Sequence, residues 1–419
     1  MNARYQSHRA PRHAALLALL AVASSLPAQQ VVAPPPPVAV APPGYQQVTA
    51  NGVQQITPSK EEPAEPKEAP LLQQGILSVR PRMSYRLVSG DGIQSTLGHP
   101  VTTTIQSLSP GVLLGLGEHW TLDYAPTWTF YSNRTFRDTV DHAASLAAGY
   151  SSGESTIGFS QTYTLASPTL VETGQQTRQE SYATGINGSH RLGHYTLMDL
   201  AASQSVMHAD AFTSSRSSTV SGMLHYQFSE RLDMAGGLSV AFVDVNVGPD
   251  MTTTRPQAQI GWRPTDKVSL DIHGGVENRG FRSGGMSNMS NPVYGASVRY
   301  RPVESTTLAL DANRGVSTSL FANEITKSTG WGANLQQRLL EEFSLSFGYT
   351  EAKTNYLATE TTVTAGRDDK DYSFNVRLST TFLRRGSIGV FYQKGHNSSN
   401  TLGYGFSTNQ YGLEIGYRF

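Results

Sequence analysis

The feature that most constrains the fold is a two-residue alternation of apolar and small polar side chains that recurs from residue 75 onward. Residues 343–350 (FSLSFGYT) are the clearest example, and residues 270–277 and 372–382 repeat the pattern. Successive side chains of a β-strand point to opposite faces of a sheet, so this period predicts strands with one apolar and one polar face. We therefore expect an all-β fold.

Short turn sequences divide this region at an interval of about 38 residues. Eight of them are marked by turn-forming residues, at positions 117–118, 152–153, 192–193, 229–230, 264–266, 302–304, 341–342 and 385–386. Longer polar segments, such as 281–290, 358–369 and 397–401, alternate with these turns. Eight short turns joining nine longer hairpins predict about eighteen strands, with sixteen as the alternative count.

The polar faces of these strands carry Asp, Arg, Gln, Ser and Thr, and the other faces are apolar. So many strands exceed what a soluble sandwich normally uses. Hydrocarbon requires every backbone donor and acceptor to be paired in a closed ladder, with apolar side chains outside and polar ones inside. We therefore predict that residues 75–419 form a transmembrane antiparallel up-and-down β-barrel.

Residues 1–28 have the parts of a cleaved signal peptide. Arg4, Arg9 and Arg12 precede the apolar run 14–23, and small residues lead to a cleavage site near Ala28. The apolar run is half the ~20 residues that a spanning helix needs, so a retained anchor is the weaker interpretation. We expect export to the bacterial outer membrane.

Residues 29–74 are expected to form a Pro-rich, disordered periplasmic leader. Ten of the 22 prolines lie between residues 29 and 70, including Pro34 to Pro37, and a mixed-charge stretch follows at 60–68. Such a composition cannot pack a core and favours extended, partly polyproline structure. The leader is either a spacer or a contact for peptidoglycan or a partner protein.

The last strand alternates without a break and ends on an aromatic residue. Its apolar positions are Tyr411, Leu413, Ile415, Tyr417 and Phe419. This pattern resembles the signal that the outer-membrane barrel assembly machinery reads. The alternative is that Phe419 only belongs to the aromatic girdle at the membrane interface.

Two of the turns share a formula in which Arg-Pro precedes a Leu-x-Asp strand. Residues 261–271 read GWRPTDKVSLD and residues 300–311 read YRPVESTTLALD, with weaker copies near residues 190–199 and 229–233. Over residues 75–419 the chain resembles the β-barrel porin family often linked to exopolysaccharide loci. The resemblance implies a porin-like barrel tied to polysaccharide export and implies no catalytic residue.

Composition and motifs give no support for other chemistry. The chain has no cysteine, and its 32 basic and 32 acidic residues create no field that would recruit nucleic acid. Residues 149–153 (GYSSG) match a serine-nucleophile motif, but they fall in an expected β-turn without placeable Asp and His partners. His273 beside Asp271 and Glu277 is the nearest approach to a metal site, and a solvated lumen wall explains it better. We expect no catalytic residue, metal, cofactor or nucleic-acid partner.

Charged residues occupy inward positions of several strands near the short turns. The candidates for lining a pore are Arg263, Asp271, Arg299, Arg301, Asp311, Arg377 and Arg418. In one interpretation they form a ladder of opposite charges that fixes strand register. In the other they form a charged constriction that biases the passage of ions or sugars.

A barrel of this size encloses an aqueous channel unless something fills it. We expect a porin-like channel for small hydrophilic solutes or saccharides, embedded in outer-membrane lipid. The alternatives are a structural or adhesive barrel and an outer-membrane hydrolase. Whether loops or the leader plug the pore is left open by the sequence.

Overall fold

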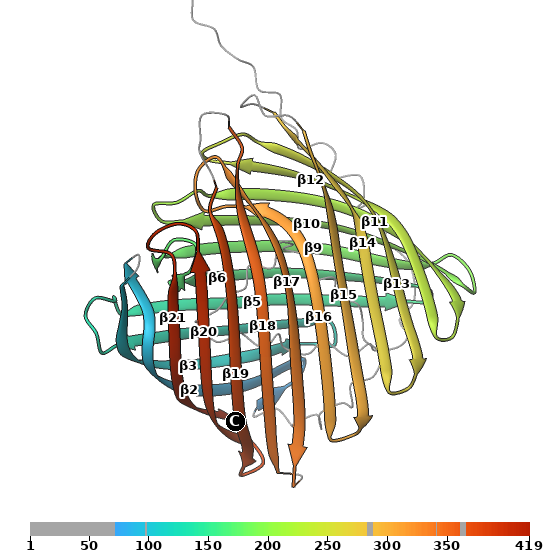
Figure 1. Ribbon diagram of the computed structural model, residues 1–419. Coiled ribbons are helices and arrows are strands. Elements are labelled where there is room, and N and C mark those ends of the chain that lie inside the picture. Colours follow the sequence, from blue (N-terminus) through green and yellow to red (C-terminus); the bar gives the residue numbers. More distant parts are fainter. Residues whose placement is uncertain (1–71, 97–98, 283–287, 341, 361–365) are drawn as a thin grey trace, which may run out of the picture.

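The computed structural model describes residues 72–96, 99–282, 288–340, 342–360 and 366–419. Eighteen long antiparallel strands form a closed barrel (Figure 1). Each strand pairs with its neighbours in chain order, and the first, β2 (Leu77–Thr96), pairs with the last, β21 (Phe406–Arg418). This closure confirms the expected fold class and the count of eighteen strands over sixteen.

The expected signal peptide and all but the last residues of the expected leader lie outside the described residues. The short strand β1 (Leu72–Gln74) precedes Gly75 and pairs with the start of β2. No helix in the described part of the chain is long and apolar enough to cross a membrane.

The remaining barrel strands follow one another as hairpins. They are β3 (His99–Leu116), β4 (Trp120–Tyr131), β5 (Thr139–Ser152), β6 (Ser155–Ala166), β9 (Gln179–Arg191), β10 (Thr196–Ala209), β11 (Ser215–Ser229), β12 (Leu232–Val245), β13 (Met251–Thr265), β14 (Val268–Phe281), β15 (Met289–Val303), β16 (Thr306–Thr318), β17 (Glu324–Leu339), β18 (Phe343–Ala358), β19 (Asp368–Phe382) and β20 (Gly386–Ser399). Two further short strands, β7 (Thr169–Leu170) and β8 (Gln175–Gln176), pair only with each other.

All eight expected short turns lie at one end of the barrel, which we call the turn end, together with the carboxyl terminus (Figure 1). The other end, the hairpin end, carries the remaining connections. Gly117 and Gly153 adopt φ values of +62° and +56° in two of the short turns, a conformation that glycine adopts without steric cost.

Strand β14 shows how the sequence alternation becomes two faces. Ile272 and Val276 are 41% and 44% exposed on the outer face, whereas Glu277 on the inner face is fully buried. Large apolar side chains are exposed in this way on all sides of the barrel. An apolar exterior around a charged interior is the arrangement of a transmembrane barrel, because lipid solvates the outer face.

The Arg-Pro formula marks a β-bulge before the short turn. The register of β13 against β14 shifts between Trp262 and Thr265, and that of β15 against β16 shifts between Tyr300 and Val303. Proline has no N–H to give to a ladder, so it is tolerated where pairing is interrupted. The formula is therefore explained by turn geometry in both repeats.

Candidate functional site

Two segments narrow the hairpin end of the barrel from within. The first is the connection between β6 and β9, residues 167–178, which contains β7 and β8 and which we call the crossing loop. The second is the upper end of the β16–β17 hairpin, residues 315–325, which we call the inward tip. Together they form the constriction.

The crossing loop lies across the lumen. It leaves the wall at β6, and β7 and β8 approach β2, which is four strands away around the barrel. Gln176 accepts a hydrogen bond from the N–H of Arg137 and donates one to its carbonyl, both at 3.1 Å. Leu170 is buried and packs against Ala209 and Leu320. The loop thus contacts several parts of the wall at once.

The inward tip enters the lumen because β16 separates from β15 before it ends. The β15–β16 ladder stops at Arg314, although β16 itself continues. Beyond this point Val316 and Ile325 pack against Met251 and Phe281, which lie on the inner face of β13 and β14. Ile325 is completely buried, so the tip is held by apolar contacts rather than resting loosely in the lumen.

A buried charge network occupies the place where the two strands separate. Arg279 Nη2 donates to the carbonyl oxygen of Val316 at 3.1 Å and to Glu277 Oε1 at 2.7 Å. The other carboxylate oxygen of Glu277 accepts from Arg255. The guanidinium of Arg279 therefore satisfies a carbonyl that the lost ladder leaves without a strand partner, and Glu277 balances its charge.

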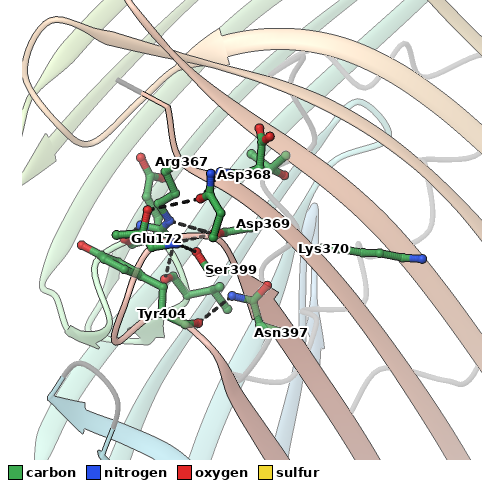
Figure 2. Close-up of polar contacts among 12 residues, drawn as sticks. Glu172, Arg367, Asp368, Asp369, Lys370, Asn397, Ser399 and Tyr404 are labelled. Atoms are coloured by element: carbon green, nitrogen blue, oxygen red, sulfur yellow. Dashed lines mark hydrogen bonds and ion pairs between the residues drawn. The ribbon is translucent and has the colours of Figure 1, made fainter. Parts of the chain in front are cut away.

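Arg367, in the β18–β19 connection, ties the crossing loop to the far side of the barrel (Figure 2). Its Nη1 donates to the carbonyl oxygen of Glu172 at 2.7 Å, and its Nη2 donates to that of Val171 at 3.2 Å. Asp369 accepts from Arg367 Nε at 2.9 Å and balances the buried charge. Since β18 and β19 lie opposite β6 and β9 in the strand order, this contact reaches across the lumen at the hairpin end.

Two aromatic rings hold the guanidinium of Arg367 in place. Its Cζ lies 3.4 Å from the ring centroid of Tyr404 and 4.5 Å from that of Tyr356. Asn397 donates to the carbonyl oxygen of Tyr404 at 2.7 Å and so fixes the β20–β21 connection that carries this ring. Cation–π contacts strengthen when water is excluded, as it is from this side chain, which is 9% exposed.

Glu172 connects the crossing loop to the inward tip. Its Oε1 accepts from the hydroxyl of Ser319 at 2.6 Å and from the N–H of Leu320 at 2.7 Å. Burial raises the pKa of Glu172 above its ordinary value, against the opposing effect of these two donors and of Arg367. Protonation therefore costs this carboxyl less in the docked loop than in water.

The structure places the expected pore-lining residues on the inner face but far from the constriction. Register puts Asp271, Arg299, Asp311, Arg377 and Arg418 on the same side of their strands as other lumen residues, in the half nearer the turn end. Arg263 and Arg301 lie in the two bulges, but their backbone N–H groups bond the carbonyl oxygens of Arg231 and Lys267, which immediately precede β12 and β14; this continues the alternation and places them on the same face. Arg377 pairs with Glu414 at 2.7 Å. Within the described residues no ion pair joins Arg263, Arg299 or Arg301 to a carboxylate, so they do not form the regular charge ladder.

An arginine group on the inner face of β2 was absent from the sequence-based candidates. Arg82 pairs with Asp123 at 2.8 Å, and Arg86 lies 3.2 Å from Glu414, on the side of that carboxylate not used by Arg377. The letters RPRMSYR at residues 80–86 place arginine at alternate positions, and this spacing was the signal for an inward basic face.

His225 is a second inner-wall feature that the sequence did not reveal. Its Nε2 lies 3.1 Å from Asp199 and its Nδ1 lies 2.9 Å from Asp233, on the two neighbouring strands. A histidine that donates from both ring nitrogens is protonated and carries a positive charge. The three residues therefore join β10, β11 and β12 across the inner face.

The motifs considered for chemistry have structural roles. Ser151 lies within β5, and Gly153 forms the short turn that follows, so GYSSG is a hairpin and no helix continues it. Glu277, the expected neighbour of His273, is engaged by arginines. Among the described residues no group of three His, Asp or Glu side chains is arranged to hold a metal ion.

The C-terminal strand closes the barrel. Tyr411, Leu413, Ile415 and Tyr417 lie opposite residues of β2, and the N–H of Phe419 donates to the carbonyl oxygen of Pro81 at 2.9 Å. The rings of Tyr417 and Phe419 pack at 4.9 Å between centroids. The carboxyl-terminal aromatic therefore lies at the seam between the first and last strands.

No protein-family model matches the sequence, and no curated protein matches it. Solved structures similar in fold include OccK2 (OpdF) of Pseudomonas aeruginosa in complex with glucuronate, at 12% identity and a TM-score of 0.45, covering 81% of this chain and 98% of that one. OpdO of Pseudomonas aeruginosa is 12% identical with a TM-score of 0.46, covering 81% and 97%. OccAB4 of Acinetobacter baumannii is 12% identical with a TM-score of 0.45, covering 83% and 99%.

Proposed function

We propose that the protein is a porin-like channel of the bacterial outer membrane for small hydrophilic solutes. The observation that carries this proposal is the closed ladder of eighteen strands with an apolar outer face and a charged inner face. Such a barrel belongs in a bilayer, and eighteen strands leave a lumen wide enough for water and solutes. The expected signal peptide and the aromatic C-terminal strand favour the outer membrane and insertion by its assembly machinery.

The inner wall favours anionic solutes. Arg80, Arg82 and Arg86 lie on one strand, and Arg299 and Arg301 add charge with no ion-paired carboxylate among the described residues. A partly desolvated guanidinium binds carboxylate or phosphate with two parallel hydrogen bonds, so a wall of arginines holds anions better than cations. Asp271 and Asp311 face the same lumen and reduce the preference for anions.

Saccharide passage is the finer form of the proposal. The Arg-Pro turn formula, through its resemblance to porins linked to exopolysaccharide loci, supports a role in polysaccharide export. The charged and hydroxyl-rich lumen suits sugars that carry carboxylates. A liposome-swelling assay that compares uronic acids with neutral hexoses of equal size would test this, and equal rates would argue against a preference for acidic sugars.

The direct test of channel function is conductance. Barrel protein whose folding is verified by a heat-dependent shift in electrophoretic mobility should conduct in discrete steps when added to a planar bilayer. A silent bilayer with verified folded protein would refute an open pore.

A structural barrel is the second candidate, because the crossing loop extends over the lumen to Arg367 on the far wall. In that case conductance would be absent in the wild-type protein and would stay absent after the loop is released by Arg367→Ala. A channel that conducts only in the variant would instead identify a gated pore.

A further inference from the structure

The outer face of the barrel carries a row of cations close to the hairpin end. Arg314 on β16 and Lys353 on β18 both lie opposite Thr329 of the strand between them, and Lys353 lies directly opposite Lys370 on β19. Figure 2 shows Lys370 extending away from Arg367 and Asp369, which point into the lumen. We use the name outer basic row for the four outward cations Arg314, Lys353, Lys370 and, on β20, Lys394.

Aromatic side chains lie next to this row on the side of the turn end. Trp331 and Tyr349 pack at 5.0 Å between ring centroids, and Phe374 and Tyr392 pack at 6.5 Å. Lys394 lies opposite Phe374 itself. Outward aromatic residues mark the interface between hydrocarbon and head groups. The outer basic row therefore lies at the level of lipid head groups.

The positive charge of this surface is only partly balanced. Glu351 pairs with Lys370 at 2.8 Å, and Asp368 on the same face accepts a hydrogen bond from the Asn355 side chain. Lys353 and Lys394 are exposed and have no ion pair among the described residues. Like charges directly opposite each other destabilise a strand pair, and Glu351 pairs only with Lys370, so an anion bound beside Lys353 would offset the remaining repulsion.

Arg314 adds a polar group that lacks a partner. Its Nε is buried and makes no hydrogen bond within the described residues. The row thus brings four cations against two carboxylates, with one guanidinium nitrogen unsatisfied. Lysine stems run along apolar surface and place their ammonium groups among the head groups, where lipid phosphates lie.

We propose that the outer basic row binds the phosphate group of anionic lipids in the leaflet at the hairpin end. The occupant is a phosphate-bearing lipid, since the aromatic surface beside the row accommodates acyl chains and the ammonium groups reach the phosphate. The inference rests on the membrane placement in the proposed function but not on conduction. Binding would anchor β16 to β20, the strands that carry the inward tip and Arg367.

The test is native mass spectrometry of the folded full-length barrel in detergent, titrated with phosphatidylglycerol and with phosphatidylcholine of the same chain length. The variant Lys353→Gln/Lys370→Gln/Lys394→Gln should bind phosphatidylglycerol at least roughly 10-fold more weakly, because each surface lysine contributes to attraction of anionic lipid. The control Lys267→Gln/Arg384→Gln/Arg385→Gln removes equal charge from the turn end and should bind as the wild type does.

Equal affinity of the two triple variants would overturn the proposal, as would equal binding of the two lipids by the wild type. Abolition of lipid binding by inorganic phosphate at matched ionic strength would also overturn it, in favour of a soluble-anion site. If the triple variant does not fold, Lys353→Gln alone removes the opposed charge pair and should fold while binding the anionic lipid more weakly. Lipid binding by a barrel that does not conduct would refute an open pore but not the lipid site.

Discussion

Arg367 donates from Nη1 to the carbonyl oxygen of Glu172 at 2.7 Å, across 195 residues of sequence. This hydrogen bond joins two connections from opposite walls of the barrel. Because it ends on a backbone carbonyl, it fixes the path of the crossing loop whatever the protonation of the Glu172 side chain. The opening at the hairpin end of the barrel therefore depends on a contact that neither segment makes alone.

Replacing Arg367 by alanine should release the crossing loop. The change leaves Asp369 buried without its cation and two carbonyl groups without donors, a loss of about 3–5 kcal/mol for a buried pair. We expect a larger single-channel conductance in planar bilayers. Arg231→Ala, which removes an exposed arginine at the turn end, is the matched control. Equal conductance of both variants would show that the loop does not limit the current.

Acid should favour the docked crossing loop. Burial raises the pKa of Glu172, so its contribution to docking is fully present below its ordinary value of 4.5 and declines as the pH rises through the raised pKa. Nearby charges act in both directions, since Arg367 lowers this pKa and Asp369 raises it. We expect a longer closed dwell time in single-channel records at acid pH than at neutral pH.

Glu172→Gln supplies the control for this pH effect. Glutamine keeps an acceptor for Ser319 and Leu320 but does not titrate, so the dwell time of the variant should be constant across the same pH range. A pH dependence that persists in the variant would assign the effect to another group. Glu324, another carboxyl of the inward tip, would be examined next.

The unpaired inner arginines should control ion selectivity. Arg299→Gln with Arg301→Gln removes two charges from the lumen, and at ~0.1 M salt their field extends about 10 Å. The reversal potential in a KCl gradient should shift toward cation preference. Asp271→Asn with Asp311→Asn should shift it the other way. No shift in either variant would mean that these residues lie outside the path of the ions.

Loss of the last residue should impair assembly. Deletion of Phe419 removes its ring contact with Tyr417 and the backbone hydrogen bond to Pro81 at the seam. We expect less heat-modifiable barrel in outer-membrane fractions. Leu402 lies in the β20–β21 connection and is 99% exposed, so Leu402→Ser should have no effect. Normal levels of heat-modifiable barrel after the deletion would show that Phe419 is not needed for assembly.

The candidate site divides into a part that the sequence indicated and a part that it did not. Arg299, Asp271 and the other pore-lining candidates were identified because alternation within a strand indicates which face a side chain occupies. Their charge pairing was not predictable, and the structure shows that Arg377 is bound by Glu414 while Arg299 is not paired in the described chain. Pairing depends on the distance between strands that the sequence does not place side by side.

The sequence alone determined the barrel, because its evidence is local. Period-two alternation, eight short turns and an aromatic last strand can each be recognised within a few residues. In hydrocarbon, only a closed ladder pairs every backbone donor and acceptor of such strands. The constriction was decided by tertiary structure. Arg367 lies in a polar stretch and Glu172 in a connection between strands, with no local signal that either folds inward. Closing the barrel brings them together, and their burial makes each depend on the other.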